Sequence, residues 1–221
     1  MSTENEALLN DIRLDEIEGI LIDIDDTIYN YEPNHLNALL GCHKEITKYD
    51  SVDIDFNEFK SLYRNARNKI TEALNPLSAC RSRALAFDLL FNELGFKNTY
   101  VHAMNYEKLY WDKFLENIEP YQHIVSFLEQ CKKNKKTISA VTDMQYLFQV
   151  MKLKKMNVVH LIDFLVTSEE AGKEKPHIEI FDLALFKMKL KPNDVIMIGD
   201  SYEKDIIGAS NAGIESIHLQ A

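Results

Sequence analysis

Two acidic residues separated by one position follow the first apolar run of this 221-residue chain. The run Ile20, Leu21 and Ile22 leads into Asp23, and Asp25 lies two residues further on. Residues two apart project from the same side of an extended backbone, so these carboxylates would repel each other. A fold that keeps such a pair usually supplies a cation or a proton between them. The pair therefore predicts a metal or acid–base site, with an acidic surface loop as the competing interpretation.

Polar residues suited to chemistry recur at three later points, each at an expected strand end or helix start. They are Thr142 with Asp143, Lys175 before Pro176, and Gly199-Asp200-Ser201 with Asp205 five residues beyond Asp200. Each group alone is weak evidence, because an isolated threonine at a strand end is more often a helix cap and an isolated lysine is usually solvated. Their order along the chain favours the functional interpretation.

The elements that must position these residues alternate between strands and helices. Short apolar runs predict strands at 18–24, 137–142, 164–167, 195–198 and 214–219. Helical periodicity predicts helices at 121–133, 145–156, 178–190 and 206–212. Such alternation predicts a Rossmann-like α/β fold with a parallel sheet and right-handed crossovers. Because ligands bind beyond the carboxyl ends of parallel strands, we expect Asp23, Thr142 and Asp200 at one edge of the sheet.

The segment between the first strand and residue 118 shows only helical stripes. An all-helical block directly after a single strand is unlike a regular alternating fold. We therefore predict an α/β core domain formed by residues 1–32 and 118–221. An α-helical domain, residues 33–117, is expected to be inserted into it.

Composition limits the classes of function. Apolar residues make up 46% of the chain, yet none of its apolar runs approaches the roughly 20 residues of a membrane span. The acidic start lacks the pattern of a signal peptide, so we expect a cytoplasmic protein. The net charge of −10 argues against nucleic-acid binding but allows a small phosphorylated ligand. The three scattered cysteines suggest neither a disulfide framework nor a zinc site.

In this order, the four groups resemble the four sequence motifs of the haloacid dehalogenase-like (HAD) hydrolase superfamily. The wording is close at Asp23-Ile24-Asp25-Asp26-Thr27-Ile28-Tyr29 and at Gly199-Asp200-Ser201. The resemblance covers residues 18–30 and 121–219, and it is greatest to the branch whose helical cap follows the first motif. Asp143 departs from the pattern, since many relatives carry asparagine there.

The resemblance implies roles for the acidic residues. Asp23 is expected to be the nucleophile that forms an aspartyl-phosphate, and Asp25 the general acid and base. Mg²⁺ is expected between Asp23, Asp200 and phosphate oxygens, with the backbone carbonyl of Asp25 as a further ligand. Asp205 is expected to orient Lys175 or a metal-bound water.

The remaining motif residues are expected to bind phosphate or to shape the site. Thr142, Lys175 and the backbone amide of Asp143 would hold the phosphoryl oxygens. The Thr27 hydroxyl would fix the loop that carries Asp25. In the predicted cap, Arg81 and Arg83 are candidates for substrate contacts, although a solvated helix face is an equally good interpretation.

The expected function is thus a Mg²⁺-dependent phosphatase acting on a small phosphorylated metabolite, as a monomer or a homodimer. A sugar-phosphate mutase would use the same pair of aspartates and stays open. A haloacid dehalogenase needs neither a metal nor an acid two residues after the nucleophile, so Asp25 argues against it. The intact set of motifs argues against a non-catalytic binding module.

Overall fold

The computed structural model describes residues 2–48 and 52–220, and the chain divides into two compact units. The first, called the core unit below, comprises Met1–Asn30 and Glu119–Ala221. The second, called the helical unit, comprises Tyr31–Ile118.

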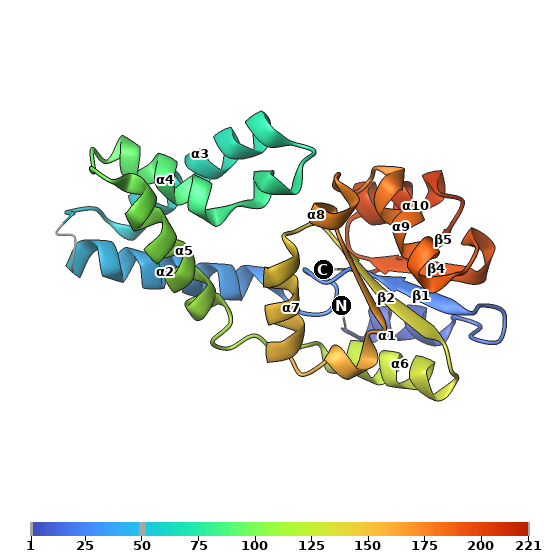
Figure 1. Ribbon diagram of the computed structural model, residues 1–221. Coiled ribbons are helices and arrows are strands. Elements are labelled where there is room, and N and C mark those ends of the chain that lie inside the picture. Colours follow the sequence, from blue (N-terminus) through green and yellow to red (C-terminus); the bar gives the residue numbers. More distant parts are fainter. Residues whose placement is uncertain (1, 49–51, 221) are drawn as a thin grey trace. The chain divides into compact units, whose positions relative to one another are not determined.

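A parallel five-stranded sheet forms the centre of the core unit (Figure 1). Its strands are β1 (Gly19–Ile22), β2 (Thr137–Thr142), β3 (Phe164–Thr167), β4 (Val195–Gly199) and β5 (Glu215–His218). They lie in the order β3-β2-β1-β4-β5, and every neighbouring pair is parallel. The predicted parallel sheet is confirmed. The first strand is shorter than predicted, because β1 ends at Ile22 and Asp23 and Asp25 already belong to the following loop.

Helices cover both faces of this sheet. They are α1 (Ser2–Asn10), α6 (Gln122–Lys133), α7 (Tyr146–Lys155), α8 (Ser168–Ala171), α9 (Ile178–Met188) and α10 (Gly208–Asn211), with short 3₁₀ turns η2 (Val159–Leu161) and η3 (Pro192–Asp194) and a π-helical segment η4 (Tyr202–Ile207). Helices α9 and α10 lie on one face, whereas α1 and α6 lie on the other (Figure 1). The last helical stretch therefore begins at residue 202 and not at the predicted residue 206.

The central strand is buried on both faces, which explains its uninterrupted apolar run. Leu21 joins a core cluster with Val141, Met197 and Phe181 of α9. Its neighbour Ile20 points to the opposite face and is equally buried. The packed sheet is a rigid support for the loops that follow its strands.

Within the described residues of the helical unit, 31–48 and 52–118, all regular elements are helical. They are α2 (Tyr31–Lys48), α3 (Phe56–Leu74), the 3₁₀ turn η1 (Ser78–Arg81), α4 (Arg83–Glu93) and α5 (Thr99–Phe114). Asp55 and Ser82 cap α3 and α4, because each side chain accepts a hydrogen bond from a backbone amide of the first turn. Within residues 2–48 and 52–220, no helix is both long and apolar enough for a bilayer crossing.

Candidate functional site

The loops after three neighbouring strands bring the predicted site residues together at one edge of the sheet. Strand β1 pairs with β2 on one side and with β4 on the other. Asp23 follows β1, Thr142 ends β2, and Asp200 follows β4. The backbone amide of Asp23 donates to the carbonyl of Ile198 at 3.0 Å, which ties the first loop to β4. This edge is where open α/β sheets bind ligands.

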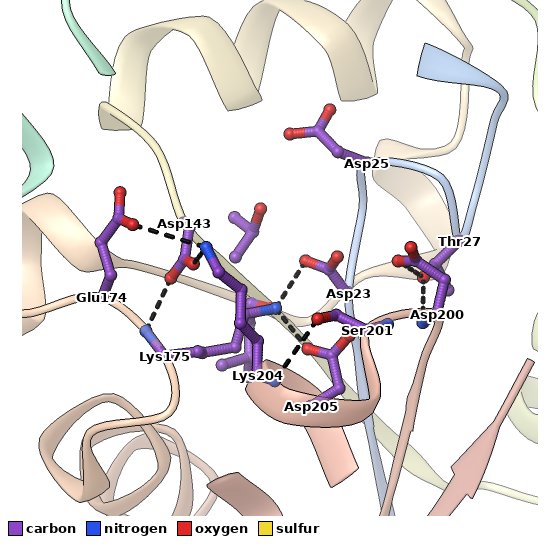
Figure 2. Close-up of polar contacts among 12 residues, drawn as sticks. Asp23, Asp25, Thr27, Asp143, Glu174, Lys175, Asp200, Ser201, Lys204 and Asp205 are labelled. Atoms are coloured by element: carbon purple, nitrogen blue, oxygen red, sulfur yellow. Dashed lines mark hydrogen bonds and ion pairs between the residues drawn. The ribbon is translucent and has the colours of Figure 1, made fainter. Parts of the chain in front are cut away.

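A buried lysine links two of the predicted aspartates (Figure 2). Lys175 is only 3% exposed, and its Nζ atom lies 2.8 Å from the Asp23 carboxylate and 2.6 Å from that of Asp205. It also donates to the carbonyl of Val141 at 3.0 Å. Burial alone would lower the pKa of Lys175, but the carboxylates of Asp205 and Asp23 raise it. The lysine therefore carries a fixed positive charge beside the candidate nucleophile.

Burial raises the pKa of Asp23 well above its ordinary value. Lys175 opposes this shift, whereas the charges of Asp205 and Asp25 add to it. Burial and the nearby Asp205 likewise raise the pKa of Asp200. The carboxylates of Asp23, Asp200 and Asp205 together thus hold more negative charge than Lys175 neutralises. A further cation would therefore be bound favourably.

The position of Asp205 depends on the π-helical segment η4 and on Gly199. The backbone amide of Ser201 donates to the Asp205 carboxylate at 3.0 Å, so the carboxylate folds back over the start of η4. A Cβ atom on Gly199 would overlap this carboxyl group. Only glycine leaves room for Asp205, which is fully buried. π-helical turns are frequent at functional sites.

Asp200 and Thr27 are joined by two hydrogen bonds. The Thr27 hydroxyl donates to Asp200 Oδ1 and accepts from the Asp200 amide, each at 3.1 Å. The expected role of Thr27 was to fix the Asp25 loop; its hydroxyl contacts Asp200 and so joins that loop to the one after β4. The turn itself is made at Asp26, whose φ of 61° is a left-handed conformation that aspartate tolerates.

Three carboxylates form a candidate cation site. One oxygen from each of Asp23, Asp200 and Asp205 lies within 4.8 Å of the others. Hard carboxylate oxygens are the ligands that Mg²⁺ prefers. The donor set therefore fits such an ion, and it includes Asp205, which the sequence analysis placed outside the ligands.

Asp25 lies in a different environment from Asp23. In Figure 2 its carboxylate points away from the cluster around Lys175. It accepts hydrogen bonds from the Tyr29 hydroxyl, from Gln149 and from the buried Lys152. Burial would raise the pKa of Asp25, but Lys152 and these hydrogen bonds lower it below its ordinary value. None of these three contacts was predicted from the sequence. Gln149 and Lys152 lie on a helix with an ordinary amphipathic pattern, and Tyr29 was quoted only as part of the first motif.

The side chain of Asp143 holds the loop that carries Lys175. It accepts from the Lys175 backbone amide at 2.8 Å and from Lys204 Nζ at 2.6 Å. This side-chain role differs from the prediction, in which the backbone amide of Asp143 bound phosphate, and Lys204 was not among the predicted residues. Thr142 is buried and accepts from Gln149 Nε2 at 2.7 Å.

The two arginines expected to contact substrate lie in the helical unit. Arg81 ends η1 and is half-buried. Arg83 is 6% exposed, donates to the Tyr31 hydroxyl at 2.5 Å, and lies 5.2 Å from the centre of the Tyr110 ring. For Arg83 the solvated-face interpretation is wrong, because its side chain is buried among aromatic rings of this unit.

Known proteins resemble the chain along most of its length. A ribulose-1,5-bisphosphate 5-phosphatase of Halopiger xanaduensis is 26% identical over 90% of this chain and 83% of its own. The pyrimidine 5'-nucleotidase YjjG of Escherichia coli is 36% identical over 92% of this chain and 86% of its own.

A solved structure of 2-haloacid dehalogenase from Pseudomonas syringae has a TM-score of 0.75 at 17% identity, covering 92% of this chain and 86% of its own. At that identity the likeness shows the fold alone. The family model described as haloacid dehalogenase-like hydrolase matches residues 20–219. The chain therefore belongs to the haloacid dehalogenase-like hydrolase family.

Proposed function

We propose that the protein is a Mg²⁺-dependent phosphatase that hydrolyses a small phosphomonoester through an aspartyl-phosphate on Asp23. The observation that carries the proposal is the buried ion-pair cluster in which Lys175 contacts both Asp23 and Asp205. Phosphate monoesters repel nucleophiles by their negative charge. A carboxylate nucleophile with a fixed ammonium beside it can approach such a group and divide a difficult hydrolysis into two steps.

Asp23, Asp200 and Asp205 would hold the metal ion. When bound, Mg²⁺ would neutralise the developing negative charge of the phosphoryl group. The chain's own residues would orient the substrate: Lys175 and the Thr142 hydroxyl would bind phosphoryl oxygens together with the amide of Asp143. Whether the backbone carbonyl of Asp25 is a further ligand stays a prediction.

Asp25 is proposed as the acid and base. It would protonate the leaving oxygen when Asp23 attacks phosphorus, and it would later take a proton from the water that hydrolyses the aspartyl-phosphate. The contacts from Lys152, Gln149 and Tyr29 hold the carboxylate in the form that accepts a proton, which suits the second step. A dehalogenase would not need this residue, so its presence favours the phosphatase.

The substrate class proposed is a small phosphorylated metabolite. The activities for which the two relatives are named, those of a ribulose-1,5-bisphosphate 5-phosphatase and a pyrimidine 5'-nucleotidase, support this class. The helical unit is proposed as the cap that selects the substrate, with Arg81 and Arg83 as its candidate residues. A cytoplasmic location, the lack of a nucleic-acid partner and a monomeric or homodimeric state stay predictions.

The direct test is a panel of phosphate esters, including p-nitrophenyl phosphate, sugar phosphates and nucleoside monophosphates, assayed with and without Mg²⁺. We expect Mg²⁺-dependent phosphate release that is abolished by Asp23→Asn and by Asp25→Asn. Absence of turnover on the whole panel would refute the phosphatase. Transfer of phosphate within a sugar phosphate, without release, would favour the mutase.

A further inference from the structure

Lys152 is a charged residue of the core unit that was not predicted from the sequence to belong to the site. It lies on α7 and its side chain is completely buried. Fully buried lysines are rare, because an ammonium group loses its hydration when it is removed from water. Such a residue needs a specific partner, and the structure identifies one.

The partner is the carboxylate of Asp25. Lys152 Nζ lies 2.5 Å from Asp25 Oδ1, and the Tyr29 hydroxyl donates to the same oxygen. The ammonium also lies 5.7 Å from the centre of the Tyr29 ring, within the range of a cation–π contact. One side of the carboxylate is thereby fixed by a buried charge and a buried phenol.

Gln149 fixes the other side of the same carboxylate. It lies three residues before Lys152, so both side chains leave the same face of α7. Its Nε2 atom donates to Asp25 Oδ2 at 3.1 Å and to the Thr142 hydroxyl at 2.7 Å. Gln149 is itself fully buried. One helix face therefore connects the proposed acid–base residue to the proposed phosphate-binding threonine.

We propose that Lys152 and Gln149 are positioning residues that hold the Asp25 carboxylate for hydrolysis of the aspartyl-phosphate. This inference rests on the proposed function of Asp23 and Asp25. In that step, a water proton moves to Asp25 while the water oxygen bonds to phosphorus. The bond between phosphorus and the Asp23 oxygen breaks, and its electron pair returns to the Asp23 carboxylate. A base held on both oxygens receives the proton in a defined direction.

A purely structural ion pair is the competing explanation. Burying an ion pair is weak evidence for a contribution to stability, and removing one partner destabilises a protein whatever its role. The test must therefore separate the step that uses Asp25 as a base from the step before it, and it must compare variants in the presence and absence of Asp25.

The experiment uses Mg²⁺ and enzyme in excess over p-nitrophenyl phosphate. Nitrophenolate leaves without needing a proton, so its release reports formation of the aspartyl-phosphate, whereas phosphate release reports its hydrolysis. We expect Lys152→Met and Gln149→Met to release nitrophenolate at near the wild-type rate. Phosphate release should slow by about tenfold or more, which is part of the roughly 10²–10⁴-fold that general base catalysis supplies. Lys155→Met, an exposed lysine of the same helix, is the matched control and should behave as wild type.

A second comparison places Lys152→Met in the Asp25→Asn background. If Lys152 acts through Asp25, the double variant should hydrolyse the intermediate no more slowly than Asp25→Asn alone. An additional loss equal to that seen in the wild-type background would overturn the inference, as would wild-type phosphate release by both single variants.

Failure of the proposed function gives a different result. If Asp25→Asn itself releases phosphate at the wild-type rate, Asp25 is not the base, and the inference falls with that role. If Lys152→Met does not fold, the phosphate release of Gln149→Met tests the inference instead, because this substitution removes an amide without leaving an unpaired charge.

Discussion

Replacing Lys175 by methionine tests the electrostatic basis of the site. The substitution leaves the carboxylates of Asp23 and Asp205 buried, 7% and 0% exposed, without the ammonium that lies 2.8 and 2.6 Å from them. Removing one partner of a buried ion pair typically costs about 3–5 kcal/mol. We expect the free energy of unfolding to fall by about that amount in metal-free protein.

The loss of unfolding free energy caused by Lys175→Met should depend on pH and on divalent cations. Burial already raises the pKa of Asp23, and the substitution removes the lysine that opposes this shift, so Asp23 holds its proton to a higher pH than in the unfolded chain and stability falls as pH rises. The destabilisation should therefore be larger at about pH 8 than at about pH 5. Mg²⁺ should recover part of the loss, because it supplies positive charge to the same carboxylates.

Urea unfolding followed by far-UV circular dichroism measures both effects. The matched control is Lys132→Met, which breaks a half-exposed ion pair with Asp163 at 2.6 Å and should cost no more than about 1 kcal/mol. A loss for Lys175→Met no greater than that of the control would refute the electrostatic account. So would a destabilisation that is the same at both pH values.

Two further predictions concern Gly199 and His35. Gly199→Ala should displace the Asp205 carboxylate and lower phosphatase turnover by at least about tenfold in a steady-state assay. Gly41→Ala is the control and should leave turnover unchanged, because the atoms nearest to the added methyl group belong to the flexible Lys113 side chain. Burial and nearby cations lower the pKa of His35 to about 3, so the unfolded chain binds a proton near pH 6.5 that the folded unit does not. The free energy of unfolding, followed by the fluorescence of Trp111, should therefore fall by at most about 2 kcal/mol between about pH 6.5 and about pH 5, and His35→Gln should reduce this fall.

The parallel sheet could be predicted because its central strand is buried on both faces. That burial requires a short uninterrupted apolar run, which is visible at residues 20–22. The candidate residues were visible for a related reason. Polar side chains such as Asp23 and Asp200 interrupt apolar runs abruptly, and the alternation of strands and helices places those interruptions at one edge.

The partners of Asp25 could not be predicted, because their chemistry depends on burial. On an amphipathic helix, a glutamine and a lysine three residues apart are typical of a solvated face, and nothing in the pattern around Gln149 and Lys152 distinguishes them. The fold buries both against Asp25. The backbone of η4 was missed for a similar reason, since its residues lack an apolar stripe and are held by Ser201 and Asp205.

The central claim is that Asp23 forms a covalent bond to phosphorus. The most direct measurement is to mix the enzyme and Mg²⁺ with a turned-over phosphate ester, quench with acid, and map the phosphoryl group by peptide mass spectrometry. The account predicts phosphate on the peptide that contains Asp23, accumulation of this species in Asp25→Asn, and none in Asp23→Asn. Release of phosphate with no phosphorylated Asp23 at any time, or a phosphoryl group on another residue, would contradict it.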